Sequence, residues 1–324
     1  MTALQERLLA CRTIHFSKSG VFWECKLRDA SDGFPEGLTQ VYIPIEGHVK
    51  KNPLSKIWTH IIDHYTFCNL TYSNDRLVAL SGVARAVQIE NKDQYVAGMW
   101  RKDLEHQLCW TTFFTAPARS SDYRAPTWSW GSLDTCTTVG AFYGAIAAGK
   151  NDHTLLAHVD EVSVISSGKN PLGNLSSAYL KIVCPGLLSG SFEQEYNYWF
   201  GGHLRFFEVT ELSDADKEMT ISLDCDEVIP EMLYLLPLVK KERPTGEMVA
   251  GLVIAPTGGP RGEFRRYGSF NKEYDHDVEE DVRSFKAFLR ELKETGLATA
   301  ASVCLERDAP LLEHPDEKFM ITLI

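Results

Sequence analysis

The sequence predicts an α+β protein, with an N-terminal helical layer packed on a C-terminal, mainly antiparallel β region that contains one long helix. Apolar residues recur at three- and four-residue spacing between positions 54 and 110, which is the period of an amphipathic helix. From about Thr137 the pattern changes to short β-like runs separated by turns that contain Gly and Pro. Residues 282–292 then return to helical spacing, which places the long helix near the end of the chain.

Length and composition favour more than one region. The chain has 324 residues, of which 44% are hydrophobic and 24% are charged, as in ordinary globular proteins. Single hydrophobic cores usually stop growing at roughly 250–300 residues. We therefore distinguish residues 1–30, a helical region over 31–135 that ends in a Trp-Ser-Trp signature, and a β-rich region over 136–324 with a helix near 277–295.

Charge and cysteine content exclude several classes of protein. The net charge of −11 argues against a nucleic-acid partner, which needs a basic surface to neutralise phosphates. No run approaches the roughly 18 apolar residues of a membrane-spanning helix, and the N-terminus lacks the apolar segment of a secretory signal. The eight cysteines stand alone, without a C-x-x-C pair that would predict a metal or redox site. We expect a cytoplasmic protein with reduced thiols and no membrane contact.

The first elements are predicted to be a helix and a hairpin. Leu4–Leu9 favours a helix at the start of the chain. Residues 12–16 and 21–25 are rich in β-branched and aromatic side chains and flank a Ser-Lys-Ser-Gly turn, which predicts two strands. Gly and Pro punctuate residues 29–53, so we expect a loop there.

Three helical patterns follow this loop. The first covers residues 54–65, whose apolar side chains fall on one face. The second is expected to start at Ser73 or Asn74, both good N-cap residues, and to end near Val87. The third extends from about Lys92 to Trp110.

The β region is predicted to hold strands and one helix. The strands are expected at 155–164, 178–183, 204–209, 219–223, 232–239, 248–255 and 264–268, with closing strands at 303–305 and 319–324. The helix begins among acidic residues at 275–281, where the helix dipole favours negative charge, and Gly296 is expected to end it.

The aromatic segment from Asp122 to Gly131 is the most informative part of the chain. In an extended segment Trp128 and Trp130 point the same way, and Arg124 shares their parity. One interpretation is a binding surface formed by Asp122, Arg124, Trp128 and Trp130. The other, which we favour, is an anchoring strand that joins the helical layer to the β region.

Catalytic chemistry is not indicated by any motif. The sequence lacks a G-x-S-x-G elbow, a Walker A loop and a G-x-G-x-x-G turn. His60 and His64 are four apart on a predicted helix, but a third metal ligand is missing from the pattern. We therefore expect no metal and no cofactor. His15 and Glu24 are the candidate catalytic residues, as a polar pair on adjacent strands that is equally interpreted as a cross-strand contact.

The aromatic segment also carries a family resemblance. Residues 123–131, Y-R-A-P-T-W-S-W-G, resemble the Y-R-A-P-S-W-S-W-A stretch of fungal heterokaryon-incompatibility (HET) domain proteins. Further blocks that resemble the family in the same order are Leu4–Leu9 with Arg12, His15–Phe16 and Phe22–Cys25, then 75–82 (D-R-L-V-A-L-S-G), 95–100 (Y-V-A-G-M-W), 170–173 with 179–180, and 262–268. The resemblance spans nearly the whole chain and is strongest before residue 131.

The resemblance also implies that most of the HET core is absent from this sequence. HET proteins normally begin with a core that resembles a TIR-like α/β fold, and residues 1–30 match only the tail of that core. Ala10 and Cys11 stand where the family usually has Ser and Pro. The activity of the HET core therefore does not carry over to this chain.

Three functional interpretations stay open at this point. The resemblance implies a role in fungal non-self recognition through a protein partner of the HET type. The alternative is a cofactor-independent enzyme of fungal secondary metabolism, of the cyclase or isomerase type, that folds a hydrophobic small molecule in a cavity lined by Trp128 and Trp130. A third interpretation is that the chain is a fragment of a longer product.

Overall fold

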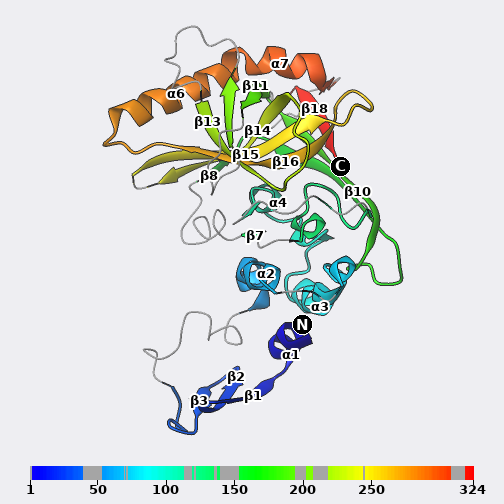
Figure 1. The fold of residues 1–324 in the computed structure, drawn as a ribbon, viewed down its shortest axis with the longest axis vertical. Coiled ribbons are helices and arrows are strands. Elements are labelled where there is room, and N and C mark those ends of the chain that lie inside the picture. Colours follow the sequence, from blue (N-terminus) through cyan, green and yellow to red (C-terminus); the bar gives the residue numbers. More distant parts are fainter. Residues whose placement is uncertain are drawn as a thin grey trace.

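A computed structural model of the chain confirms the predicted α+β fold, with a helical N-terminal part and a C-terminal sheet. Figure 1 shows the large sheet with its long helix at one end of the molecule, the helical layer in the middle and a small N-terminal sheet at the opposite end. The structure describes residues 2–38, 53–68, 70, 72–112, 119, 122–134, 137–138, 153–193, 202–206, 218–243, 245–307 and 318–324.

The N-terminal part is a helix followed by a small antiparallel sheet. Helix α1 (Thr2–Leu9) leads into β1 (Arg12–Ser17), β2 (Gly20–Cys25) and β3 (Asp29–Ser31), which pair in that order. The predicted helix and hairpin are therefore confirmed. Strand β3 lies in the predicted loop 29–53, of which residues 39–52 fall outside the described ranges.

The helical layer is more broken than its apolar periodicity predicts. The first pattern forms η3 (Leu54–Ile57) and α2 (Trp58–Thr66). The second forms two 3₁₀ turns, η4 (Ser73–Asp75) and η5 (Val78–Leu80), before α3 (Ser81–Asn91). The expected start at Ser73 or Asn74 is wrong, because the continuous helix begins only at Ser81.

The third predicted helix, from Lys92 to Trp110, is also wrong. Its place is taken by a hairpin of β4 (Tyr95–Val96) and β5 (Met99–Trp100), and by the short helix α4 (Leu104–Gln107). Ala97 (φ 48°) and Gly98 (φ 98°) form the turn with left-handed backbone, which a continuous helix cannot contain. The hairpin and α4 are buried on several sides, so most of their positions carry apolar side chains. Some of these positions therefore match the three- and four-residue spacing of a helix.

Two helices cover part of the large sheet. Helix α6 (Glu279–Glu294) buries Phe285 and Phe288 against the sheet, as the apolar spacing predicts. Gly296 does not simply end this helix, because α7 (Gly296–Val303) begins there. The strands that make up the sheet are β8 (His153–Leu155), β9 (His158–Ser166), β10 (Leu175–Cys184), β11 (Leu188–Glu193), β12 (Gly202–Phe206), β13 (Glu218–Leu223), β14 (Met232–Arg243), β15 (Gly246–Pro256), β16 (Glu263–Glu273), β17 (Leu305–Glu306) and β18 (Phe319–Leu323).

The sheet is mainly antiparallel and partly closed on itself. Its 11 described strands follow the order β13-β12-β11-β14-β15-β16-β18-β10-β9, with β8 on β14 and β17 on β18. Strand β13 also pairs with β16, so β11 to β16 form a closed hydrogen-bonded ring. Only the β16–β18 pairing is parallel among the described pairs. Strand β12 confirms the start of the run predicted at 204–209, and residues 207–209 lie outside the described ranges.

One hydrophobic core joins the helical layer to the sheet. It contains Trp58 and Leu80 from the helical layer together with Leu252 and Leu323 from the sheet, all of them buried. A second cluster, which includes Phe285 of α6, lies between that helix and the sheet. The regions over 31–135 and 136–324 therefore share a core.

Candidate functional site

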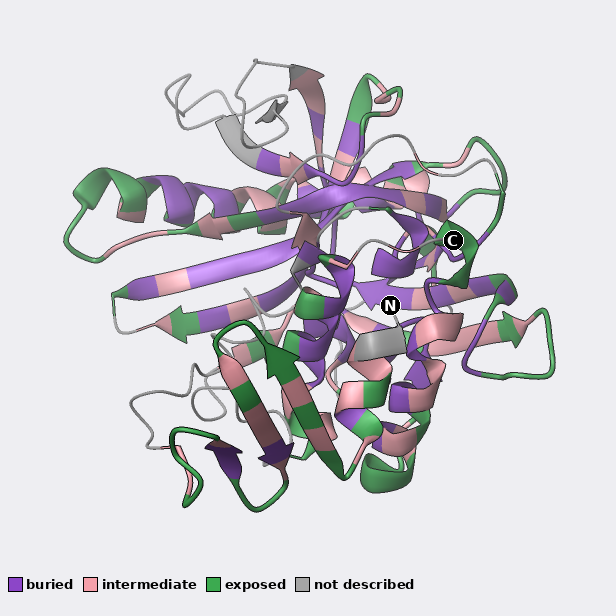
Figure 2. Cartoon of the chain, turned by 60° about the horizontal axis from the view of Figure 1, so that its bottom comes forward, coloured by how far each residue is buried: buried purple, intermediate pink, exposed green. Residues whose placement is uncertain are grey.

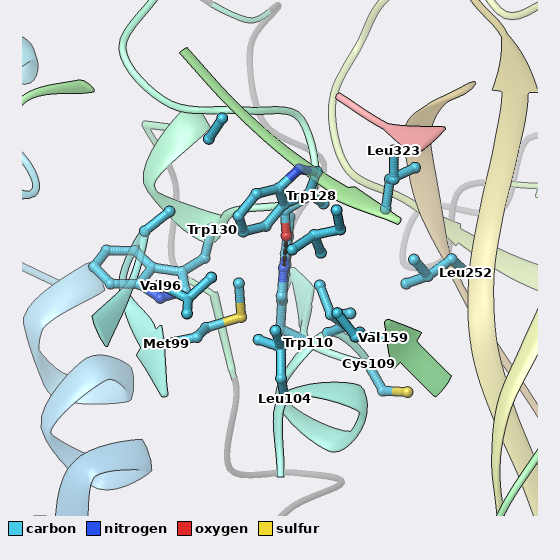
Figure 3. Close-up of a cluster of buried hydrophobic side chains, with 14 of the residues drawn as sticks. Val96, Met99, Leu104, Cys109, Trp110, Trp128, Trp130, Val159, Leu252 and Leu323 are labelled. Atoms are coloured by element: carbon cyan, nitrogen blue, oxygen red, sulfur yellow. Dashed lines mark hydrogen bonds between the residues drawn. The ribbon is translucent and has the colours of Figure 1, made fainter. Parts of the chain in front are cut away.

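The two indoles of the Trp-Ser-Trp signature lie in the shared core. Trp128 and Trp130 are 0% exposed, and Figure 3 shows them among side chains of both regions, such as Met99 and Leu323. Trp130 belongs to the 3₁₀ turn η6 (Trp130–Ser132), so the segment is not a continuous strand. The expected binding surface is not formed by these indoles, because neither reaches the molecular surface.

The signature instead holds the β4–β5 turn by hydrogen bonds. Trp130 Nε1 donates to the Gly98 carbonyl at 3.1 Å, and Ser129 Oγ donates to the Ala97 carbonyl at 2.6 Å. A Cβ at Gly98 would lie 2.7 Å from the Trp130 ring, so the indole requires glycine at this turn. Trp110 Nε1 donates to the Trp128 carbonyl at 2.8 Å, the dashed contact in Figure 3.

Arg124 and Asp122 have different environments. Arg124 is buried, and its guanidinium donates to the Gly131 carbonyl at 2.9 Å and to the Ser73 carbonyl at 3.0 Å. Its Nη1 also lies 2.8 Å from the Asp134 carboxylate. Asp122 is exposed. The structure thus brings Arg124, Trp128 and Trp130 together between the regions. This matches the anchoring role of the favoured interpretation, but the strand that it predicted is wrong, because the segment is made of turns.

The candidate pair on the hairpin is in contact. His15 Nε2 lies 3.1 Å from Glu24 Oε2, on adjacent strands β1 and β2. Arg7 of α1 donates to the same carboxylate from Nε at 3.0 Å and from Nη2 at 3.2 Å. The Glu24 side chain is 8% exposed, whereas those of His15 and Arg7 are about 40% exposed (39% and 42%). These contacts join α1 to the hairpin, and the Glu24 side chain is the hydrogen-bond acceptor that they share.

The face of the small sheet opposite this cluster is apolar and exposed. Ile14 lies opposite Trp23, and Phe16 lies opposite Val21, so these four side chains project from the same face. Ile14 is 51% exposed, Phe16 82% and Val21 37%. We call Ile14, Phe16, Val21 and Trp23 the hairpin face. Figure 2 shows the strands of this sheet at the near side of the molecule, coloured mostly as exposed or intermediate.

Basic side chains surround the hairpin face. Arg12 lies at one end of the face, Lys18 in the β1–β2 turn and Lys26 just after β2, and all three are exposed. None of them is paired with an acidic side chain in the part of the chain that the structure describes. Sequence reasoning missed this surface because alternating apolar residues in a strand normally indicate a buried face. The available sequence signal for this surface was the series Arg12, Lys18 and Lys26 within a chain of net negative charge.

A ligand-sized cavity lies away from both the tryptophans and the hairpin. It has a volume of about 480 Å³ and is bounded by the segment after β5, by α4 and by β8. Its wall includes Arg101, His106 and His153, and it includes neither Trp128 nor Trp130. The cavity therefore differs in place and in chemistry from the aromatic pocket that the enzyme interpretation requires.

The described ranges contain neither a metal-binding cluster nor a membrane-spanning helix. There, no three His, Cys, Asp or Glu side chains converge on a point that could hold a metal ion. Every cysteine within these ranges carries a free thiol, and Cys136 lies outside them. None of the described helices combines the length and the apolar character that crossing a bilayer requires.

No family model, no curated protein and no solved structure matches this chain. What the chain does must therefore be inferred from its own residues and their geometry. Two surfaces stand out, the hairpin face and the cavity beside α4.

Proposed function

We propose that this chain is a HET-like protein of fungal non-self recognition that acts in the cytoplasm by binding a protein partner of the HET type through the hairpin face. The observation that carries the proposal is the exposure of Ile14, Phe16 and Val21 on one side of a small sheet. Contiguous exposed apolar side chains with a polar rim are typical of protein-binding surfaces. Free thiols at the described cysteines fit a reducing compartment.

The build of the small sheet also favours a partner. Sheets of two or three short strands are marginal in water unless one face packs on another element. Here α1 packs on α3, while β1, β2 and β3 make their principal contacts with one another. A partner surface laid on the hairpin face would bury Ile14 and Phe16, and each would contribute about 1.5–3 kcal/mol when fully buried.

The charges around the hairpin face indicate which kind of partner surface is complementary to it. Arg12, Lys18 and Lys26 surround the apolar residues, whereas the whole chain carries a net charge of −11. A complementary partner has an apolar patch bordered by Asp or Glu side chains, which would steer association and fix orientation. Because residues 1–30 resemble the tail of a HET core, we infer that the partner is a protein of the HET type.

The alternative function, a cofactor-independent cyclase or isomerase acting on a hydrophobic molecule, gains no support from the aromatic segment. Both indoles are fully buried, so they offer no wall to a substrate. The cavity beside α4 is lined by charged side chains such as Arg101 and Glu105, which suit a polar molecule.

The test is co-expression with full-length HET-domain proteins in a fungal host, with co-purification and growth arrest as readouts. We expect Ile14→Asp to reduce co-purification about tenfold or more, because it places a charge in the apolar contact. Ile165→Asp on β9 is the matched control, since Ile165 is also a strand isoleucine and is 54% exposed.

Two results would overturn the proposal. One is equal loss of binding in Ile14→Asp and Ile165→Asp, which would show that the hairpin face has no special role. The other is self-association of the chain that Ile14→Asp abolishes while no HET protein binds, which would assign the face to a second copy instead.

A further inference from the structure

The cavity beside α4 contains a buried histidine with unused hydrogen-bonding capacity. His106 is 2% exposed, and neither ring nitrogen has a hydrogen-bond partner in the structure. Its ring lies against that of His153 from β8, with centroids 4.5 Å apart and planes at 89°. Buried polar groups are nearly always paired, because an unpaired one loses the hydrogen bonds that it made to water. An imidazole in this state, on the wall of an open cavity, is available to a ligand.

Two of the three acidic side chains that line the cavity accept hydrogen bonds from the backbone, and the third, Asp103, stands among the remaining polar groups. Glu105 Oε1 accepts the Val159 backbone N–H at 2.8 Å. Asp93 accepts the backbone N–H of Gln94 at 2.7 Å and that of Lys102 at 3.1 Å. Because these carboxylates are held by backbone donors, they belong to the framework of the cavity.

The remaining polar groups of the cavity are mainly donors. The side chains of Lys102 and His153 form no hydrogen bond within the described residues, and both line the cavity. Burial, followed by the neighbouring His153, lowers the pKa of His106 to about 4, so this ring is neutral at pH 7 and keeps one N–H donor. An ammonium with imidazole N–H groups is a donor set that suits an oxyanion.

We propose that this cavity binds a small oxyanion-bearing molecule, a carboxylate or a phosphate, through His106, His153 and the ammonium of Lys102. The volume of about 480 Å³ admits a compact polar metabolite. A transition-metal ion is the competing ligand for two imidazoles, but within the described ranges no third ligand converges with them. The site is separate from the hairpin face, so the two proposals stand or fall independently.

The test uses NMR of the histidine ring protons and nitrogens in the full chain, which contains 10 histidines. Inorganic phosphate and succinate are titrated separately at pH 7 and constant ionic strength, since salt screens weak ion binding. We expect saturable shifts of the His106 and His153 signals, with the tighter of the two probes identifying the phosphate or the carboxylate as the natural group. The signals of the exposed His60 and His64 should not move.

Two lysine variants test whether anion binding depends on the cavity. Lys102→Met should weaken binding of the better probe about tenfold, because it removes a charged donor from the cavity. Lys169→Met, at an exposed lysine outside the cavity, is the matched control and should change nothing. The proposal is overturned if neither probe gives saturation by about 50 mM. It is equally overturned if Lys102→Met and Lys169→Met behave alike, or if Zn²⁺ saturates the two histidines while the anions do not.

Discussion

The guanidinium carbon of Arg266 lies 3.4 Å from the ring centroid of Trp110, stacking a residue of β16 on the helical layer. Arg266 is 0% exposed, and it also binds Asp224 through Nε at 2.9 Å and Nη2 at 3.0 Å. Its remaining donors reach the carbonyls of Leu108 at 2.5 Å and Trp110 at 2.6 Å. One buried cation thus ties together two regions that are far apart in sequence.

Removing this cation should strongly destabilise the protein. In Arg266→Met the buried Asp224 carboxylate loses its bidentate partner but keeps Arg119 Nη2 at 2.9 Å, and two backbone carbonyls lose their donor. We expect the free energy of unfolding to fall by about 3–5 kcal/mol in urea titrations. Arg266→Lys should also be unstable, because an ammonium cannot reproduce the planar fork. Arg243→Met is the control, since Arg243 forms a solvent-exposed pair with Glu273 and should lose less than about 1 kcal/mol. Similar losses in both Met variants would contradict this account.

The turn beneath Trp130 should tolerate only glycine. Gly98→Ala combines a left-handed backbone, φ 98°, with a Cβ that would lie 2.7 Å from the indole. The strain and the overpacking together should reduce the free energy of unfolding by about 2–4 kcal/mol. Gly258→Ala separates the two effects, because φ there is 81° but nothing lies within 4 Å of the added Cβ. Circular dichroism melts of the two variants should therefore differ, and equal melting temperatures would refute the packing argument.

Acid should destabilise the protein through His106. Burial is the largest cause that lowers the pKa of His106, and together with the neighbouring His153 and Lys241 it brings this pKa to about 4, although Asp103 acts in the opposite direction. The unfolded chain, with an ordinary histidine pKa near 6.5, takes up this proton more readily than the folded protein. Stability is therefore unaffected above about pH 7 and falls as the pH drops from 6.5 towards 4, by up to about 3 kcal/mol. Urea titrations at several pH values should show that His106→Gln removes this dependence, whereas His60→Gln at an exposed position leaves it in place.

The end of α3 offers a stabilising substitution. Lys92 caps the helix with left-handed backbone, φ 54°, and its N–H donates to the Gln88 carbonyl. Glycine is the preferred residue in this conformation. Lys92→Gly should raise the free energy of unfolding by about 0.5 kcal/mol, the relief of strain being partly offset by the greater entropy of glycine in the unfolded chain. The same substitution at Lys169, outside any helix, should give no gain, and a loss of stability in Lys92→Gly would contradict the prediction.

The parts of the fold that sequence predicted are those where local pattern and packing agree. Strands β14, β15 and β16 carry dense runs of β-formers, and α6 carries a clear apolar stripe, so neighbouring residues alone identify them. The hairpin β4–β5 was missed because its turn at Ala97 and Gly98 depends on Ser129 and Trp130, which lie much later in the chain. No local signal distinguishes such a turn from a helix with a tolerated glycine.

The functional surfaces were predicted less completely. The contact between His15 and Glu24 follows from hairpin geometry, which brings residues on adjacent strands together. The anchoring role of Trp128 and Trp130 was also anticipated, although their complete burial removes them as a binding surface. The meeting of His106 with His153 could not be foreseen, because it arises only when α4 packs against β14, which carries β8 on its edge.

The position of β18 between β10 and β16 has a consequence for synthesis of the protein. Strand β10 is complete at Cys184 and pairs with β9 along one edge, but β18, its partner along the other edge, begins only at Phe319. At translation rates of about 5–20 residues per second, this edge of β10 stays without its hydrogen-bonding partner for on the order of ten seconds during synthesis. The ring from β11 to β16 can close during that interval, and β9 with β10 joins it only when β18 emerges. A nascent chain of this kind is exposed to aggregation at one strand edge, so its yield in cells should depend on chaperones that shield that edge.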